Sequence, residues 1–236
     1  MLKRNLIITV FIFLLLINAA AAAAEAGNGL RQYSKAEGYC YLTFGRYPYD
    51  EDGGERPILW RVLETADGTA YLISEYILEV SRLHSLAFGY PGWDKADLNA
   101  WLQADFLETA FTPEETLALR TIPELGRASL PSSEDLKNGD FGFVSDQSRR
   151  AVGTPWADSR GLYFYRHKNH SPYWTRTQSA KEFAHRSIKL EGNIGYLGVT
   201  GDDMGVRPVI WLDMGLILLE QGSGTLSDPF VAVPAD

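Results

Sequence analysis

Residues 58–73 read ILWRVLETADGTAYLI. Side chains in the first six positions alternate between two faces, and this period of two residues predicts a β-strand with a mixed outer face. Asp67-Gly68 is a hairpin signal, because both residue types tolerate the backbone angles of a tight turn. Residues 69–73 are the returning strand, so the segment predicts an antiparallel β-hairpin.

A further strand is predicted before this hairpin. Aromatic and apolar side chains crowd residues 39–47, and Pro48 ends the strand because it has no backbone N–H group. Residues 49–55 then form an acidic loop rich in turn-forming residues. Residues 25–38 are polar and contain glycine, which predicts a mobile leader.

The middle of the chain has helical signals. Asp94 is a candidate N-cap for a segment whose apolar side chains recur at helical spacing and form one stripe. Thr112-Pro113-Glu114-Glu115 has the signature of a capping box, which predicts a second, shorter helix to about residue 120. The apolar stripe of the first helix consists of Leu98, Trp101, Leu102 and Phe106.

The last third of the chain is again rich in strand signals, separated by Gly, Asn, Asp and Pro. Residues 216–219 can pair with residues 230–233 across a Gly-rich turn. A short strand is also predicted at residues 141–144, followed by a helical turn that Ser145 caps. The other strand-like segments are residues 162–166, 173–177, 187–190, 194–199 and 206–212.

These elements predict one α+β domain over residues 39–236, with mixed and antiparallel strands at both ends of the chain enclosing two central helices. The chain has 236 residues, of which 45% are hydrophobic, which suffices for a packed core. A formal charge of −8 argues against nucleic acid as a partner, because phosphate binding requires a basic surface. Cys40 is the single cysteine, which excludes an internal disulfide and a zinc site built from cysteines.

The first 24 residues have the pattern of a secretory signal peptide. Lys3 and Arg4 precede an apolar run at residues 6–17, and a run of alanines at residues 19–24 offers small-residue cleavage sites. The apolar run is shorter than the roughly 20 residues that span a bilayer, although an uncleaved anchor is the alternative. We expect a secreted, periplasmic or cell-surface protein without a membrane span in its mature form.

Several motifs resemble, in their order, the bacterial family of unknown function DUF6273. The resemblance runs from about Phe44 to Leu212 and implies an exported or surface-associated domain, without implying an activity. The motifs are Phe44-Gly45-Arg46-Tyr47-Pro48, Ile58-Leu59-Trp60-Arg61-Val62-Leu63, Trp93, Asp97-Leu98-Asn99-Ala100-Trp101-Leu102, Phe106, Ala110-Phe111-Thr112, Tyr173-Trp174-Thr175-Arg176-Thr177 and Gly205-Val206-Arg207-Pro208-Val209-Ile210-Trp211-Leu212.

The last two motifs are also similar to the C-terminal half of C-type-lectin-like domains, including the branch of the formylglycine-generating enzymes. This similarity implies a C-type-lectin-like topology. The enzymes of that branch depend on paired cysteines in the C-terminal part of the domain. The only cysteine here, Cys40, lies near the first predicted strand, so the similarity does not extend to that activity.

Catalytic and metal-binding motifs are weak in this sequence. No Gly-x-Ser-x-Gly motif is present, and Cys40 fits a packed thiol better than a nucleophile. His167, His170 and His185 could bind a metal, but Arg and Lys neighbours favour a solvated loop. The acidic residues 50–55 and 202–203 could bind calcium or be charged turns, and neither segment matches a full calcium loop. We therefore expect no metal and no cofactor.

Aromatic residues and arginines concentrate between residues 156 and 176. Tyr, Trp and Arg favour recognition sites because they combine large rigid contact areas with hydrogen-bonding groups. Alternate residues of the strands, Trp174 in particular, could equally belong to the core. The candidate ligand-binding residues are Trp156, Arg160, Tyr163, Tyr165, Arg166, Tyr173, Trp174 and Arg176.

The sequence therefore predicts a noncatalytic recognition or surface module that binds a glycan or a cell-surface protein. Two alternatives stay open, an extracytoplasmic hydrolase that uses carboxylates and a structural protein of the cell envelope. A deep pocket with clustered acids would favour the hydrolase. Complete burial of the aromatic rings would favour the structural protein.

Overall fold

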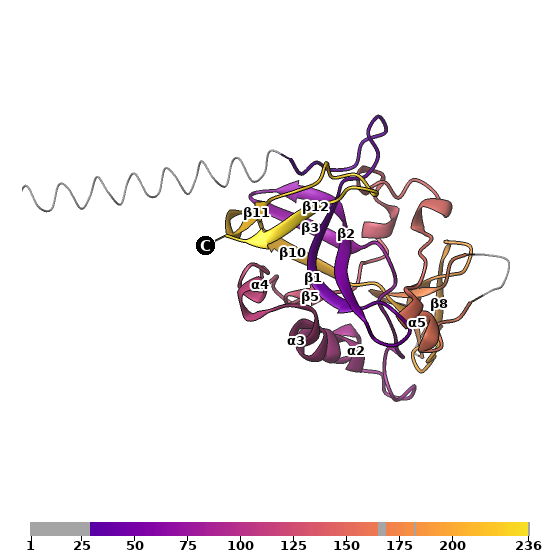
Figure 1. Ribbon diagram of the computed structural model, residues 1–236. Coiled ribbons are helices and arrows are strands. Elements are labelled where there is room, and N and C mark those ends of the chain that lie inside the picture. The colour runs from indigo at the N-terminus through magenta and orange to yellow at the C-terminus, as the bar shows by residue number, and fades with distance from the viewer. Residues whose placement is uncertain (1–28, 165–168, 182, 236) are drawn as a thin grey trace, which may run out of the picture.

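Two β-sheets and several short helices make up the chain in the computed structural model, which describes residues 29–164, 169–181 and 183–235 (Figure 1). The larger sheet contains β1 (Tyr41–Pro48), β2 (Glu55–Ala66), β3 (Thr69–Ser74), β5 (Ala128–Ser129), β10 (Val209–Asp213), β11 (Ile217–Leu219) and β12 (Phe230–Pro234). The smaller sheet contains β4 (Glu79–Val80), β6 (Tyr173–Gln178), β7 (Ala184–Ile188), β8 (Ile194–Gly198) and β9 (Gly205–Val206). The strand orders are β11-β12-β1-β2-β3-β10-β5 and β4-β9-β6-β7-β8.

The helices are short, and three of them lie together on one side of the larger sheet (Figure 1). The fold is thus mixed α+β, as predicted, with strands as the dominant element. None of the helices in the described part of the chain is long and apolar enough for a membrane span. The α-helices are α2 (Asp97–Trp101), α3 (Leu107–Ala110), α4 (Pro113–Leu117) and α5 (Pro155–Ser159); a π-helical turn joins α2 to α3 at Leu102–Phe106, and 3-10 turns lie at Trp93–Lys95, Asp135–Lys137, Gly139–Phe141, Gln147–Arg149 and Met214–Leu216.

The hairpin predicted from residues 58–73 is present as β2 and β3. Asp67 and Gly68 have φ angles of 51° and 69°, the positive values that a two-residue hairpin turn requires. The two strands pair in antiparallel register from Ala66 and Thr69 to Trp60 and Ser74, with a bulge between Val62 and Glu64. The hairpin prediction is confirmed, and β2 is longer than the alternation of side chains indicated.

Strands from the two ends of the described chain are neighbours in the larger sheet. β12 pairs in parallel with β1, where Leu42 lies opposite Phe230, and β11 pairs antiparallel with β12, as predicted. Residues 29–38 pack against the domain instead of extending from it as a free leader. Leu30 is buried in the core, and the Gln32 amide donates a 3.1 Å hydrogen bond to the backbone oxygen of Asp140.

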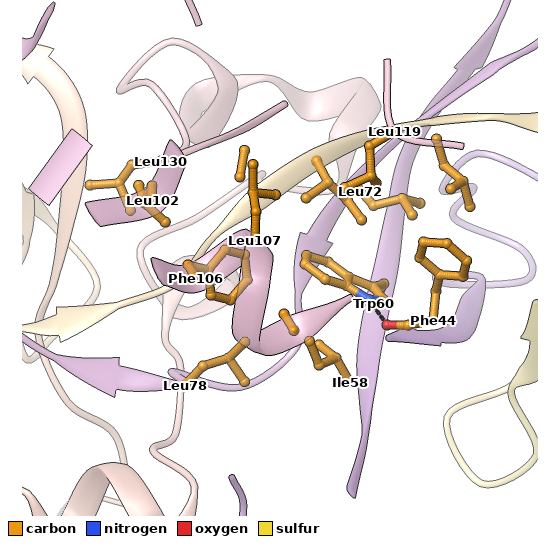
Figure 2. Close-up of a cluster of buried hydrophobic side chains, with 14 of the residues drawn as sticks. Phe44, Ile58, Trp60, Leu72, Leu78, Leu102, Phe106, Leu107, Leu119 and Leu130 are labelled. Atoms are coloured by element: carbon orange, nitrogen blue, oxygen red, sulfur yellow. Dashed lines mark hydrogen bonds between the residues drawn. The ribbon is translucent and has the colours of Figure 1, made fainter. Parts of the chain in front are cut away.

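An apolar core lies between the larger sheet and the helices (Figure 2). We call it the first core. Trp60 at its centre is fully buried, and its indole N–H donates a 2.8 Å hydrogen bond to the backbone oxygen of Phe44. The ring centroid of Phe111 lies 6.5 Å from that of Trp60, and Phe106 packs at right angles to Phe111. The Trp60 indole on β2 thus packs against Phe111, the residue that directly follows α3.

The central helices differ in part from the prediction. Asp94 lies in a 3-10 turn, and the N-cap of α2 is Ala96, which offers no capping side chain. Thr112 and Glu115 form the predicted capping box at α4. This helix ends at Leu117 instead of about residue 120, because the backbone N–H of Arg120 already bonds to the larger sheet at the Trp211 oxygen.

Several strand predictions in the last third are corrected. Residues 141–144 form no strand, and Phe141 and Phe143 are instead buried side chains of a second core that contains residues of both sheets. The segment 206–212 is split by Arg207-Pro208 into β9 and β10, which belong to different sheets. β7 begins and ends earlier than predicted, at Ala184–Ile188. Residues 162–164 are not a strand, and residues 165–166 lie outside the described part.

Buried arginines join the two sheets. Arg207 is completely buried, and its Nε donates a 2.7 Å hydrogen bond to the backbone oxygen of Ser74 at the end of β3. Its Nη1 lies 3.4 Å from the Tyr173 hydroxyl on β6. Glu75 binds Arg61 through two hydrogen bonds of 2.8 and 2.7 Å and lies 4.0 Å from Arg207. Arg207 thus connects the end of β3 in the larger sheet with β6 in the smaller sheet.

Candidate functional site

Trp156 and Arg160, the first two predicted ligand-binding residues, lie at α5 and surround Glu79. Thr154 begins this helix by accepting a 3.1 Å hydrogen bond from the backbone N–H of Ala157, and Pro155 occupies its first turn. The Trp156 indole N–H donates a 3.0 Å hydrogen bond to Glu79 Oε2. Arg160 Nε lies 3.9 Å from Glu79 Oε1, at the surface. The polar atom of the Trp156 ring is therefore already used within the fold.

Tyr173 and Trp174 are both completely buried, so the prediction that they contact a ligand at the surface is wrong. Successive residues of a strand point to opposite faces of the sheet. Tyr173 enters the second core and Trp174 enters the first core, so both faces of β6 are covered. Their polar atoms bond to the backbone oxygens of Arg149 and Ser81.

Arg176 is held inside a polar cluster. Its Nη1 lies 3.0 Å from Asp135 Oδ2 and 2.6 Å from the backbone oxygen of Leu130. The Tyr71 hydroxyl donates a 2.8 Å hydrogen bond to the same Asp135 oxygen. Burial, together with the Asp135 charge, raises the pKa of Tyr71. Tyr165 and Arg166 lie outside the described residues.

Tyr163 is the predicted residue that lines a cavity. The cavity has a volume of about 380 Å³, within the range of ligand-binding pockets. Tyr163 is 45% exposed and reaches it from the loop after α5, where its backbone N–H donates a 2.8 Å hydrogen bond to the Asp203 oxygen. The lining residues are Tyr163, Pro172, Lys189, Leu190, Glu191, Asn193, Leu197, Asp203 and Met204.

The turn between β7 and β8 supplies most of the polar lining. The backbone N–H of Lys189 donates a 2.9 Å hydrogen bond to the Asn193 oxygen, which closes the turn. The Lys189 side chain lies over Gly195, where a Cβ atom would come within 2.7 Å of Lys189 Cε. Partial burial lowers the pKa of Lys189. A larger residue at position 195 would therefore force the Lys189 side chain to shift from its present place at the cavity.

The cavity combines hydrogen-bonding groups with an apolar surface. Lys189 and Asn193 supply donors, and Glu191 and Asp203 supply carboxylate acceptors. Sequence reasoning identified Tyr163 but missed these residues. The sequence predicted Asp203 as part of a calcium site or of a charged turn, and no local pattern indicated that it lies near Tyr163.

The described residues contain no group of three or more His, Cys, Asp or Glu side chains that could hold a metal ion. His170 and His185 are buried, and His167 lies outside the described part. In the acidic loop, Asp50 is 2.6 Å from Arg56, which makes this carboxylate part of an ion pair. Cys40 is 1% exposed, in agreement with a packed thiol.

One described carboxyl group has a raised pKa. Burial, with a smaller contribution from Glu51, raises the pKa of Asp158 on α5. Asp158 does not line the cavity. A general acid needs a carboxyl group with a raised pKa at the reacting bond, and the one described carboxyl group with such a shift lies away from the cavity.

Comparisons with family models, with curated proteins and with solved structures give no match for this chain.

Proposed function

We propose that this protein is an exported, noncatalytic recognition domain that binds a glycan in the Tyr163 cavity. The cavity is the observation that carries the proposal. The order of the sequence motifs supports a relationship to the DUF6273 family, and the Trp-Thr-Arg and Gly-Val-Arg-Pro motifs support a C-type-lectin-like topology. The signal-peptide pattern supports export to the cell surface, the periplasm or the medium.

The chemistry of a sugar matches the lining of this cavity. A sugar presents hydroxyl groups that both donate and accept hydrogen bonds, and Lys189, Asn193 and Asp203 offer groups of both kinds. A sugar ring also has faces of C–H groups, which pack against aromatic and apolar side chains. Tyr163 and Leu197 provide such surfaces on the same cavity.

Glycan-array screening of the purified domain, followed by calorimetry on any retained glycan, tests the proposal. Tyr163→Ala and Asn193→Ala should each weaken binding by about tenfold, since each removes one contact of about 1.4 kcal/mol. Leu218→Ala is the matched control, because Leu218 on β11 is 43% exposed and lies outside the cavity. Glycan binding that survives both cavity substitutions, or retention of no glycan, contradicts the proposal.

Export is tested separately by N-terminal analysis of the protein made in a bacterial host. Cleavage after Ala24 and recovery outside the cytoplasm are the expected results. An intact N-terminus in the cytoplasmic fraction contradicts export without affecting the cavity.

A second candidate function is glycoside hydrolysis, because Glu191 and Asp203 line the same cavity. Hydrolysis of a glycosidic bond requires two carboxyl groups on opposite sides of the bond. Release of reducing sugar that is lost in Glu191→Gln and in Asp203→Asn would favour the enzyme. Binding without any such release favours the recognition domain.

A further inference from the structure

A second candidate binding surface lies on the β7–β8 hairpin and beside it. Phe88 is 82% exposed and Phe183 is 40% exposed, and their ring centroids are 4.9 Å apart. Phe88 comes from the loop before α2, whereas Phe183 directly precedes β7. Two aromatic rings that remain exposed while contacting each other mark a surface available for binding.

Cationic side chains lie on the same hairpin and directly before it. Lys181 Nζ lies 3.9 Å from the centre of the Tyr196 ring and donates a hydrogen bond to its hydroxyl. Arg186 on β7 lies directly opposite Tyr196 on β8. The hydrogen bond from Lys181, together with the charges of Lys181, Lys189 and Arg186, lowers the pKa of Tyr196.

No described carboxylate neutralises Lys181 or Arg186. Most arginines of the described segments form ion pairs, as Arg31 does with Glu37 and Arg120 with Asp213. Residues 181–198 carry Lys181, Arg186 and Lys189 against Glu182 and Glu191, so this segment has a small net positive charge in a chain of formal charge −8.

We propose that the surface formed by Phe88, Phe183, Lys181, Tyr196 and Arg186 binds an anionic glycan that carries carboxylate or phosphate groups. The cations attract the charged groups of such a chain, and the aromatic rings contact the C–H faces of its sugars. The β8 strand is at the edge of its sheet, so an extended polymer can lie along the hairpin. This surface goes beyond the Tyr163 cavity, and binding to it does not depend on that cavity.

Retention on immobilised polygalacturonate, compared with neutral dextran, tests the proposal with the whole protein. Binding to polygalacturonate alone is expected, and it should weaken steadily as sodium chloride increases. The double variant Lys181→Ala/Arg186→Ala should bind about tenfold more weakly, and Phe183→Ala about fivefold. The double variant Lys35→Ala/Lys137→Ala removes the same charge from exposed positions elsewhere and should bind like the unchanged protein.

Further arms distinguish a glycan from other polyanions. Equal binding to poly-glutamate, or binding only to vesicles of phosphatidylcholine and phosphatidylglycerol, would overturn the proposal in favour of an acidic protein or a membrane surface. Equal retention on dextran, or full retention by Lys181→Ala/Arg186→Ala, also overturns it. Lys181→Ala/Arg186→Ala should leave the binding of a neutral glycan in the Tyr163 cavity unchanged, because neither residue lines that cavity, and this separates the two sites. Thermal unfolding of each variant checks that the fold is preserved.

Discussion

The two sheets differ in what covers their strands. In the larger sheet, strands from both ends of the described chain pair with each other, and helices and the ring of Trp60 cover one face. In the smaller sheet, β6 is covered on both faces, whereas the outer β7–β8 hairpin combines buried side chains such as Ile188 with exposed ones such as Tyr196. Figure 1 shows β8 and β11 at opposite ends of the molecule. Both cores contain residues of both sheets, and the cavity and the exposed side chains of Phe183 and Tyr196 lie at the β7–β8 end of the molecule.

The largest effect is expected from Trp60→Ala in the first core. Removing a fully buried indole should lower the free energy of unfolding by about 4 kcal/mol, through lost apolar contacts and the cavity left behind. Chemical denaturation measures this change. Trp60→Phe keeps a ring and should cost clearly less. A loss below about 1 kcal/mol for Trp60→Ala would show that the larger sheet does not depend on this residue.

The next effect concerns the interface between the sheets. Arg207→Met should lower the free energy of unfolding by about 3 kcal/mol, because the Ser74 oxygen loses its partner and a buried charge network is opened. Hydrogen exchange should increase more in β6–β8 than in β1–β3. Arg120→Met removes a half-exposed ion pair with Asp213 and is the control, with a cost of at most about 1 kcal/mol. Uniform exchange in both sheets would contradict the role of Arg207 as a connection.

The free energy of unfolding should depend on pH through His185 on β7 of the smaller sheet. Burial lowers the pKa of His185 from 6.5 to about 4. The unfolded chain therefore binds a proton at higher pH than the folded chain, and stability is lost as pH falls from 6.5 toward 4. Between about pH 7.5 and about pH 5, the free energy of unfolding should fall by about 2 kcal/mol from this group.

His185→Asn tests the source of this pH dependence. Denaturation series at several pH values should show a flatter profile for this variant than for the unchanged protein. The hydroxyl of Tyr90, 3.3 Å from His185 Nδ1, can still bond to the Asn side chain. An unchanged slope would assign the effect to other groups.

The smallest expected difference compares two helix caps. Thr112 caps α4 beside the larger sheet and is exposed, whereas Thr154 caps α5 beside the smaller sheet and is 1% exposed. Thr112→Ala should cost about 1 kcal/mol and Thr154→Ala about 2 kcal/mol, because the second leaves a buried N–H group without a partner. The Ser variant at each position keeps the hydroxyl and serves as control. Equal costs would show that burial of the cap is unimportant.

Local signals in the sequence predicted local structure well. The Asp67-Gly68 turn and the Thr112 capping box were identified because the residues that form each feature are neighbours in the chain. Thr154-Pro155 carries a similar cap and Pro signal, yet α5 was not predicted, since its five residues have no apolar period to support it. Residues 141–144 were misassigned because a short apolar run indicates burial without specifying a strand.

The candidate site depended on contacts between distant segments. Tyr163 lines the cavity through the hydrogen bond to Asp203, forty residues away along the chain, and no local pattern indicates that contact. The sequence also did not show which aromatic side chains are exposed to solvent. Tyr173 and Trp174 belong to a strand that is covered on both faces, and both are buried. Such a strand shows no alternation of apolar and polar residues, so the sequence pattern could not distinguish these buried residues from binding residues.

The parallel pairing of β1 with β12 has a mechanical consequence. A force that separates the start of β1 from the end of β12 shears these two adjacent parallel strands along their length. Their hydrogen bonds then carry the load together instead of opening one after another. Tension between the two ends of the domain is therefore resisted at the larger sheet, at the opposite end of the molecule from β8.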